Sequence, residues 1–327
     1  MPVRSLCFVM FAQTRHQTDS AAPPRMADGS HPSGLPTPQG LDVLNAIPGD
    51  IPVHDQRDLM ERPFFSLAKT KRLAPIDYRV GDIWVRVEAL QSRGMATIWD
   101  ADILLWAGSQ LVEAQAKGLK TSPLLRATPY QMLRFMGRGT RLDDYERFFA
   151  ALGRLQGTSV TTNIRQGKRQ VAHQFNWISE WRRCTDANGA HHSIDLVVPN
   201  WFYTGILDRE LILTVDRNYF GLSGGIERWL YRVVRKHGGW QSAGWQFTFR
   251  QLYDKSGSIA RFSDFALDIR RLAVRQALPG YWLDLLRRSD GEEVLHFTHR
   301  SRLARDHPGF EIQRPFLKHT EVVSACG

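Results

Sequence analysis

Residues 255–276 read "KSGSIARFSDFALDIRRLAVRQ", which is a short turn followed by a segment with helical periodicity. Apolar residues recur there at three- and four-residue steps, which predicts an amphipathic helix over residues 261–276. The predicted inner face consists of Phe262, Phe265, Ala266, Ile269, Leu272 and Ala273. The outer face carries Arg261, Asp264, Asp268, Arg271 and Arg275, with Arg270 beside them. Such a face is either a solvated surface, where the carboxylates pair with the arginines, or a surface that contacts DNA.

The segments around this helix predict a winged helix. A helix over residues 223–238 precedes a short strand at 244–249 and a short helix at 250–257. After the helix at 261–276, two strands are predicted at 281–288 and 293–300. Asp290-Gly291 between them is a turn signal.

The same order of elements is predicted earlier in the chain. A helix at 100–118 with Asp100 as N-cap is followed by a helix at 128–137 with Thr128 as N-cap and Pro129 at its first position. A third helix at 143–156 precedes the strands "TSVTTNI" and "VAHQFNWI", which the basic turn "RQGKRQ" joins as a hairpin. Further upstream, "FFSLAK" and "DIWVRVEAL" have the alternation of strands.

The repeat lies in element order alone, because the two groups share no obvious sequence identity. It predicts an α+β protein, rich in helices, of two tandem winged-helix domains with small β-hairpin wings. The predicted divisions are a disordered arm, the first winged helix, the second winged helix and a tail, at residues 1–50, 51–190, 191–300 and 301–327. The arm is predicted from its Pro-, Gly- and Ser-rich composition.

Positive charge is concentrated on the two helical groups. The chain has a formal net charge of +10 and an isoelectric point near 9.8. Residues 126–183 contain eleven cations against four carboxylates, and residues 223–275 contain ten against four. The net positive charge of these two windows together exceeds that of the whole chain. This concentration of charge favours a polyanionic partner such as nucleic acid.

Other classes of protein find little support in the sequence. No apolar run is long enough to span a membrane, and "MPVRSLCFVMFA" lacks a convincing cleavage site for a signal peptide. Three isolated cysteines form no metal or disulfide pattern, so we expect a cytoplasmic protein without metal or cofactor. "QGKRQ" lacks the glycine and hydroxyl of a P-loop. The histidine pairs His191-His192 and His296/His299 lack the spacing of a metal-dependent nicking site, so no enzymatic activity is expected.

Several long stretches resemble the replication initiator protein A family of bacterial plasmids. They are "IPVHDQRDLMERPFFSLAKTKR", "GMATIWDADILLWAGSQLVEA", "LLRATPYQMLRFMGRGT", "WFYTGILD", "GGIERWLYRVVRKHGG" and "KSGSIARFSDFALDIRRL". The resemblance covers residues 50 to 300 and implies an initiator with two winged helices. It implies binding to directly repeated sites (iterons) in double-stranded DNA at an origin, duplex opening, recruitment of host helicase and initiator proteins, and plasmid copy control. It leaves open whether the first domain contacts DNA or forms a homodimer.

The third helix of a winged helix is the element that enters the major groove. We therefore expect the base-reading residues to be Arg261, Ser263, Asp264 and Arg271. Ser263 and Ser258 are alternative N-caps of this helix. The expected phosphate contacts in the second domain are Arg270, Arg275 and Arg235. At the tip of the first hairpin, Arg165, Lys168 and Arg169 are expected to reach the sugar-phosphate backbone or the minor groove. Arg147 and Arg154, on the third helix of the first domain, are further candidate DNA contacts. The alternative functions are a winged-helix transcriptional repressor, including one of its own gene, and a metal-dependent nicking initiator.

Overall fold

The helix predicted over residues 261–276 is present as α8 (Phe262–Val274). The computed structural model of the chain describes residues 40–165, 172–185, 192–239 and 241–311. Five of the six residues assigned to the inner face of the helix are fully buried, and Phe262 is partly buried against the same core. The amphipathic pattern thus correctly predicted which side of α8 packs inward.

The turn before α8 depends on Gly257, whose φ of +60° lies in the left-handed region. A Cβ atom at this position would lie 2.6 Å from Cβ of Pro63. Neither serine that the sequence offered as a cap fills that role: Oγ of Ser258 accepts from the N–H of Ala260 (3.2 Å), and Ser263 already lies inside the helix. Arg261 holds the N-cap position without a capping side-chain bond, so both cap predictions are wrong.

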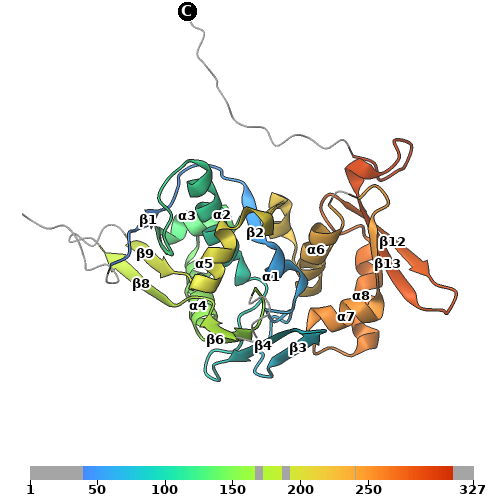
Figure 1. Cartoon of the computed structure of the whole chain (residues 1–327), viewed down its shortest axis with the longest axis horizontal. Helices are drawn as coiled ribbons and strands as arrows, with labels where there is room; N and C mark the ends of the chain where they lie inside the picture. Colours follow the sequence, from blue (N-terminus) through green and yellow to red (C-terminus); the bar gives the residue numbers. More distant parts are fainter. Residues whose placement is uncertain (1–39, 166–171, 186–191, 240, 312–327) are drawn as a thin grey trace, which may run out of the picture. The chain divides into compact units, whose positions relative to one another are not determined.

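The elements around α8 follow the order predicted for residues 223–300. They are α6 (Gly225–His237), β11 (Trp245–Thr248), α7 (Phe249–Ser256), α8, β12 (Tyr281–Arg287) and β13 (Glu293–His299). The strands form an antiparallel sheet in the order β11–β13–β12, with Gly291 at a φ of +86° in the turn before β13. Figure 1 shows the β12–β13 hairpin extending beyond α8.

An earlier group of elements has the same order, except that two further strands, within residues 158–176, lie between its third helix and its last two strands. It comprises α2 (Ala101–Ala116), β5 (Leu124–Ala127), α3 (Pro129–Phe135), α4 (Leu142–Gln156), β8 (Glu180–Thr185) and β9 (His192–Val197). The strands are arranged β1–β5–β9–β8, where β1 (Leu44–Asn45) runs parallel to β5. Oγ1 of Thr128 accepts from the N–H of Gln131 (3.2 Å) and Pro129 is the first residue of α3, which confirms the predicted start of this helix.

The basic hairpin predicted as the first wing forms, but in a different sheet. β6 (Thr158–Thr162) pairs with β7 (His173–Asn176) and with β4 (Ile83–Ala89), in the order β3–β4–β6–β7 with β3 (Ile76–Val80). The hairpin that pairs with β5 is β8–β9 instead. The wing prediction was wrong because the partner of a strand is a long-range choice that element order does not reveal. The predicted boundary at residue 190 falls between β8 and β9.

The segment "FFSLAK" is not a strand. Phe64 and Phe65 are both buried, and both rings pack on Trp177, with centroids 5.5 and 4.9 Å away. Successive residues of a strand point to opposite faces, so a regular strand does not place two neighbouring rings on one indole. The aromatic core overrides the apparent alternation.

Short elements complete the described part of the chain. These are β2 (Val53–Gln56), α1 (Arg57–Glu61), α5 (Asn200–Leu207), β10 (Ile212–Val215) and three 3₁₀ helices at Arg209–Leu211, Arg217–Gly221 and Arg300–Arg302. β2 and β10 pair antiparallel and bring residues 53–56 beside residues 212–215. Within the described ranges, no helix combines the length and hydropathy needed to cross a bilayer.

Two buried ion pairs join α6 to the elements that precede it. Nη1 of Arg228 lies 2.8 Å from Oδ1 of Asp102 on α2, and Nε of Arg232 lies 2.7 Å from Oδ2 of Asp55 on β2. All four side chains are at most 4% exposed. Part of the positive charge that the sequence places on α6 is therefore internal.

Candidate nucleic-acid interface

The outer face of α8 brings five of the predicted DNA-binding residues together. Arg261 is at the N-cap, Ser263 and Asp264 are in the first turn, and Arg271 and Arg275 are at the C-terminal end. All five are exposed. Ser263 and Asp264 are near each other (Oγ to Oδ1, 3.5 Å), so the first turn offers a donor and an acceptor beside a guanidinium.

The two C-terminal arginines of α8 are weakly paired. Arg271 is 3.6 Å from Asp268 and Arg275 is 3.9 Å from Glu227, and the two arginine side chains are 63% and 64% exposed. Exposed pairs at such distances contribute little to stability. These guanidinium groups can exchange their carboxylates for an external anion at small cost.

Arg270 has a different position. Its guanidinium donates to Glu293 on β13, with Nε 2.9 Å from Oε1, and also lies over the ring of Phe249. The hydrogen bond from Arg270 lowers the pKa of the Glu293 carboxyl. Arg270 thus connects the third helix to the hairpin, a contact that sequence alone did not suggest.

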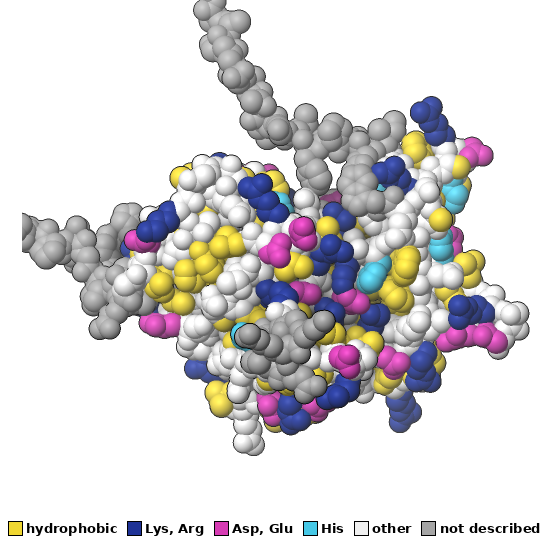
Figure 2. All heavy atoms as spheres, in the orientation of Figure 1, with side chains coloured by type: hydrophobic (Ala, Val, Ile, Leu, Met, Phe, Trp, Pro, Cys, Tyr) yellow, Lys and Arg dark blue, Asp and Glu magenta, His cyan; other side chains and the backbone are white. Residues whose placement is uncertain are grey.

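The β12–β13 hairpin carries two arginines that the sequence analysis did not single out. Arg287 ends β12, and Arg288 starts the turn with an ion pair to Glu292 at 3.6 Å. Both are exposed. The signal was present in the sequence as two adjacent arginines before the Asp-Gly turn. Figure 2 shows cationic and acidic side chains alternating on the side of the molecule where α7 and α8 lie.

Arg235 points toward the interior from α6. Its Nε donates to the carbonyl oxygen of Thr214 on β10 (2.7 Å), and it lies beside Tyr281, whose pKa burial raises to about 12. Arg235 therefore joins α6 to β10 and β12 and is separate from the outer face of α8.

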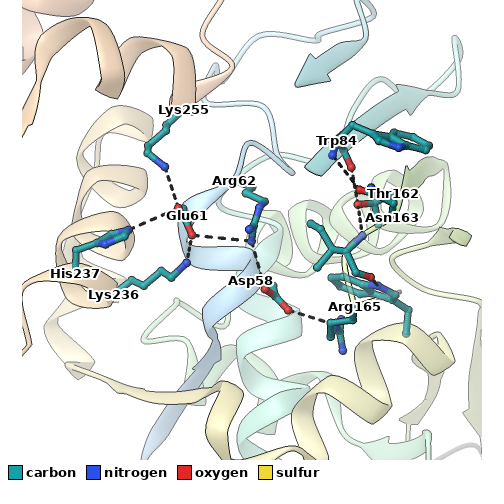
Figure 3. Close-up of polar contacts among 12 residues, drawn as sticks. Asp58, Glu61, Arg62, Trp84, Thr162, Asn163, Arg165, Lys236, His237 and Lys255 are labelled. Atoms are coloured by element: carbon teal, nitrogen blue, oxygen red, sulfur yellow. Dashed lines mark hydrogen bonds and ion pairs between the residues drawn. The ribbon is translucent and has the colours of Figure 1, made fainter. Parts of the chain in front are cut away.

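Arg165 is also held inside the protein. Its guanidinium packs over the ring of Trp201 at 3.8 Å, and its Nε lies 3.2 Å from Oδ2 of Asp58 on α1. Figure 3 shows the Arg165 and Asp58 side chains facing each other. Burial lowers the pKa of Arg165, although Asp58 opposes this effect. Lys168 and Arg169, predicted beside it, lie outside the described residues.

Glu61, also on α1, is surrounded by two lysines and a histidine from α6 and α7. It contacts Lys236 and His237 of α6, and Oε1 lies 2.9 Å from Nζ of Lys255 of α7 (Figure 3). Burial lowers the pKa of Lys236 to about 8 and, with the neighbouring cations, that of His237 to about 4. This cluster ties α1 to the helices that precede α8.

On α4, the two predicted arginines differ in their surroundings. Arg147 is exposed and lies 3.6 Å from Asp144 and 3.8 Å from Asp143. Arg154 donates two hydrogen bonds to Asp100 (2.8 and 2.7 Å). Asp100 is the N-cap residue of α2, as predicted, but its side chain makes no capping hydrogen bond, because its Oδ2 accepts from the N–H of Thr97 (2.8 Å).

The histidines considered for a nicking site have structural contacts where they are described. Nε2 of His296 lies 2.9 Å from the carbonyl oxygen of Ala243, and Nδ1 of His299 lies 2.7 Å from Oγ of Ser301. His191 lies outside the described residues. Within the described ranges, no group of three or more His, Cys, Asp and Glu side chains is arranged to hold a metal ion.

Comparison with known proteins identifies relatives and a shared fold. A protein of Wigglesworthia glossinidia brevipalpis, described as "Putative replication protein", is 30% identical over 226 residues, which is 68% of this chain and 81% of that protein. The crystal structure of domains 2 and 3 of RctB superposes with a TM-score of 0.55 at 12% identity, over 74% of this chain and 98% of the other. At that identity the superposition shows the fold alone.

Residues 54–283 match the family described as Replication initiator protein A, and this span includes α2 through α8. The match agrees with the resemblance of the long sequence stretches quoted above. The chain belongs to the replication initiator protein A family.

Proposed function

We propose that this initiator binds repeated double-stranded DNA sites at a plasmid origin through two winged helices. The observation that carries the proposal is the outer face of α8, where Arg261, Ser263, Asp264, Arg271 and Arg275 are exposed on one helix. Three further features support it: family membership, the repeated order of helices and strands, and the three-stranded sheet that follows α8. In this arrangement α8 is the major-groove helix.

The residues have separate roles in the proposed complex. The first turn of α8 and Arg271 contact base edges, because a guanidinium recognises guanine through two hydrogen bonds and a carboxylate accepts from cytosine. Arg275 contacts a phosphate. Arg270 joins the phosphate contacts once it leaves Glu293, and Arg287 and Arg288 reach the backbone from the β12–β13 wing.

The proposed action is noncovalent. Binding to several repeats distorts the duplex and presents the protein to host helicase and initiator proteins, with no catalytic residue of its own. The first winged helix contributes DNA contact or a homodimer interface. Copy control and repression of its own gene follow from the same DNA-binding face if a repeat lies in the promoter.

The test is a footprint of purified protein on the DNA that flanks its own gene, with random duplex as competitor, over a series of salt concentrations. Arg261→Ala and Arg271→Ala should each weaken specific binding by about 1–3 kcal/mol, the value of a bidentate base contact. Arg79→Ala on β3 is the matched control, because Arg79 is also an exposed arginine.

The outcomes separate the alternatives. Protection of direct repeats supports the initiator proposal, and protection of one palindrome without origin activity supports a repressor. Unchanged specific affinity in both α8 variants would show that another element reads the DNA. Mg²⁺-dependent strand cleavage would replace the noncovalent proposal with a nicking initiator.

A further inference from the structure

A strongly basic pocket lies beside α4, and no residue of α8 lines it. It encloses about 650 Å³ and is lined by seven cationic side chains, whereas Asp100 is the single carboxylate among its lining residues. The cationic residues come from α4, from α6, from the segment between α3 and α4 (Arg138), and from Lys69, Lys71 and Arg93. Such a charge excess in a concave site favours an anionic ligand.

The floor of the pocket is rigid. Arg154 donates to both oxygens of Asp100, while Arg138 and Arg228 share Asp102, with closest distances of 2.8 Å each. Asp102 is fully buried, so two carboxylates hold three guanidinium groups in fixed positions. The floor therefore keeps a positive charge after its internal ion pairs are counted.

The mouth of the pocket has cations without a carboxylate partner. Lys69, Lys71 and Arg93 are exposed and, among the described residues, form no ion pair. Nζ of Lys71 donates to the carbonyl oxygen of Ser92 (3.0 Å), and Nζ of Lys69 lies 5.5 Å from the ring centroid of Trp99. Arg147 adds a fourth exposed cation, which forms long ion pairs with Asp144 (3.6 Å) and Asp143 (3.8 Å).

Two cations at the mouth of the pocket lie where a glycine has no side chain. A Cβ at Gly153 on α4 would be 2.4 Å from Nη1 of Arg93, so the guanidinium rests against the helix backbone. A Cβ at Gly94 would be 2.6 Å from Cγ of Lys71, and Gly94 also has a φ of +80°. The absence of side chains at Gly153 and Gly94 thus leaves room for Arg93 and Lys71 against the backbone.

We propose that this pocket binds a phosphate-bearing anion. Arginine matches phosphate geometry with paired hydrogen bonds, and lysine supplies mobile charge at the entrance. The volume suits a ligand the size of a nucleotide. The phosphate belongs either to a free nucleotide or to a DNA backbone; only the DNA source rests on the proposed function.

The test compares the triple variant Lys69→Ala/Lys71→Ala/Arg93→Ala with the wild type, both as full-length chains. Calorimetry measures binding of ATP and of inorganic pyrophosphate, and a separate titration measures affinity for a 30-base-pair duplex against salt. The control triple, Lys117→Ala/Lys120→Ala/Arg209→Ala, removes three exposed cations that do not line the pocket. If the phosphate is free, the first triple loses at least tenfold in affinity for ATP or pyrophosphate.

If the phosphate is part of DNA, the slope of log affinity against log salt falls by about 2–3, because each neutralised phosphate contributes about 0.9. The control triple changes neither quantity to that extent. A first triple that behaves like the control in both titrations overturns the pocket proposal, even when the wild-type chain binds origin DNA. Conversely, pocket-dependent binding of ATP without DNA binding supports the pocket and contradicts the proposed function.

Gly153→Ala tests the geometry without removing charge. Alanine favours the interior of a helix, but its Cβ must displace the guanidinium of Arg93. Whichever of the titrations above depends on the pocket should show a several-fold loss of affinity, while the midpoint of thermal unfolding does not fall. Gly221→Ala is the control, because no atom lies within 4 Å of a Cβ built there. Equal affinity of the two glycine variants would show that Arg93 does not contact the ligand.

Discussion

Arg270 on α8 and Glu293 on β13 form an ion pair that joins the proposed major-groove helix to its wing. The side chains are 40% and 29% exposed, so the pair is accessible to solvent. Its contribution to stability is therefore small. The pair matters more for the proposed DNA binding, because Glu293 neutralises Arg270, which would otherwise be free to contact a phosphate.

Glu293→Gln should strengthen DNA binding. Loss of the carboxylate releases Arg270 for a phosphate, so affinity at low salt rises several fold and the salt slope steepens by about 0.9. The free energy of unfolding changes by less than about 1 kcal/mol. Glu88→Gln is the control, since Glu88 pairs at 3.1 Å with Arg86 on β4, an exposed arginine that is not proposed to contact DNA. Weaker binding by Glu293→Gln would mean that the pair positions α8 and the wing for DNA.

Asp102→Ala should destabilise the protein by about 3–5 kcal/mol, because it leaves the buried guanidinium of Arg228 uncompensated. Asp143→Ala removes an exposed carboxylate 3.8 Å from Arg147 and should change stability by less than about 0.5 kcal/mol. Urea unfolding measures both. A double variant, Asp102→Leu/Arg228→Met, should recover much of the loss; if it is no more stable than Asp102→Ala, the pair is not the cause.

Gly257→Ala should also destabilise the chain, by about 1–3 kcal/mol. The positive φ is strained for alanine, and the added Cβ meets Pro63 at 2.6 Å. Gly221→Ala serves as the comparison, because its φ is not in the left-handed region. Thermal unfolding of both variants checks this, and equal midpoints would show that the turn before α8 adapts.

His237 should make stability depend on acidity. Burial lowers its pKa from 6.5 to about 4. Between these two pH values the imidazole binds a proton in the unfolded chain but stays neutral in the folded chain. The contribution of the neutral imidazole to the stability of the folded chain is therefore complete above pH 6.5 and is lost as the pH falls through 4.

His237→Phe tests this linkage and keeps an aromatic ring against Trp245 and Phe247. Urea unfolding at pH 7 and pH 4.5 should show a smaller loss of stability in the variant than in the wild type. Tyr78→Phe is the control for loss of a titrating group elsewhere, because the Tyr78 hydroxyl ionises only at high pH. Equal losses in wild type and His237→Phe would show that other groups dominate the acid response.

Local patterns determined the helices and the positions where several of them begin. The apolar residues of α8 recur with the helical period, and Thr128-Pro129 supplies both a side-chain acceptor and a preset φ at the start of α3. The Asp-Gly turn before β13 is equally local. Such features depend on residues within one or two turns of each other, so the linear sequence contains the information that they require.

The charge pattern predicted exposed arginines on α8 but did not separate surface cations from internal ones. Arg235, Arg165 and Arg154 carry the same charge as Arg271, yet each has partners inside the protein. Those partners lie on β10, on α1 and before α2, tens of residues away in the chain. Periodicity identifies a helix face but not what packs against it.

By itself, the sequence determined the order of elements from α6 to β13, the inner face of α8 and the family of the protein. Only the tertiary structure decided that β8–β9, and not the basic β6–β7 hairpin, joins β5. It also decided that Arg93 lies over Gly153 beside a basic pocket. The physical reason is the range of the interactions: helices and turns are specified by near neighbours, whereas strand partners, buried ion pairs and pockets are formed by residues that only folding brings together.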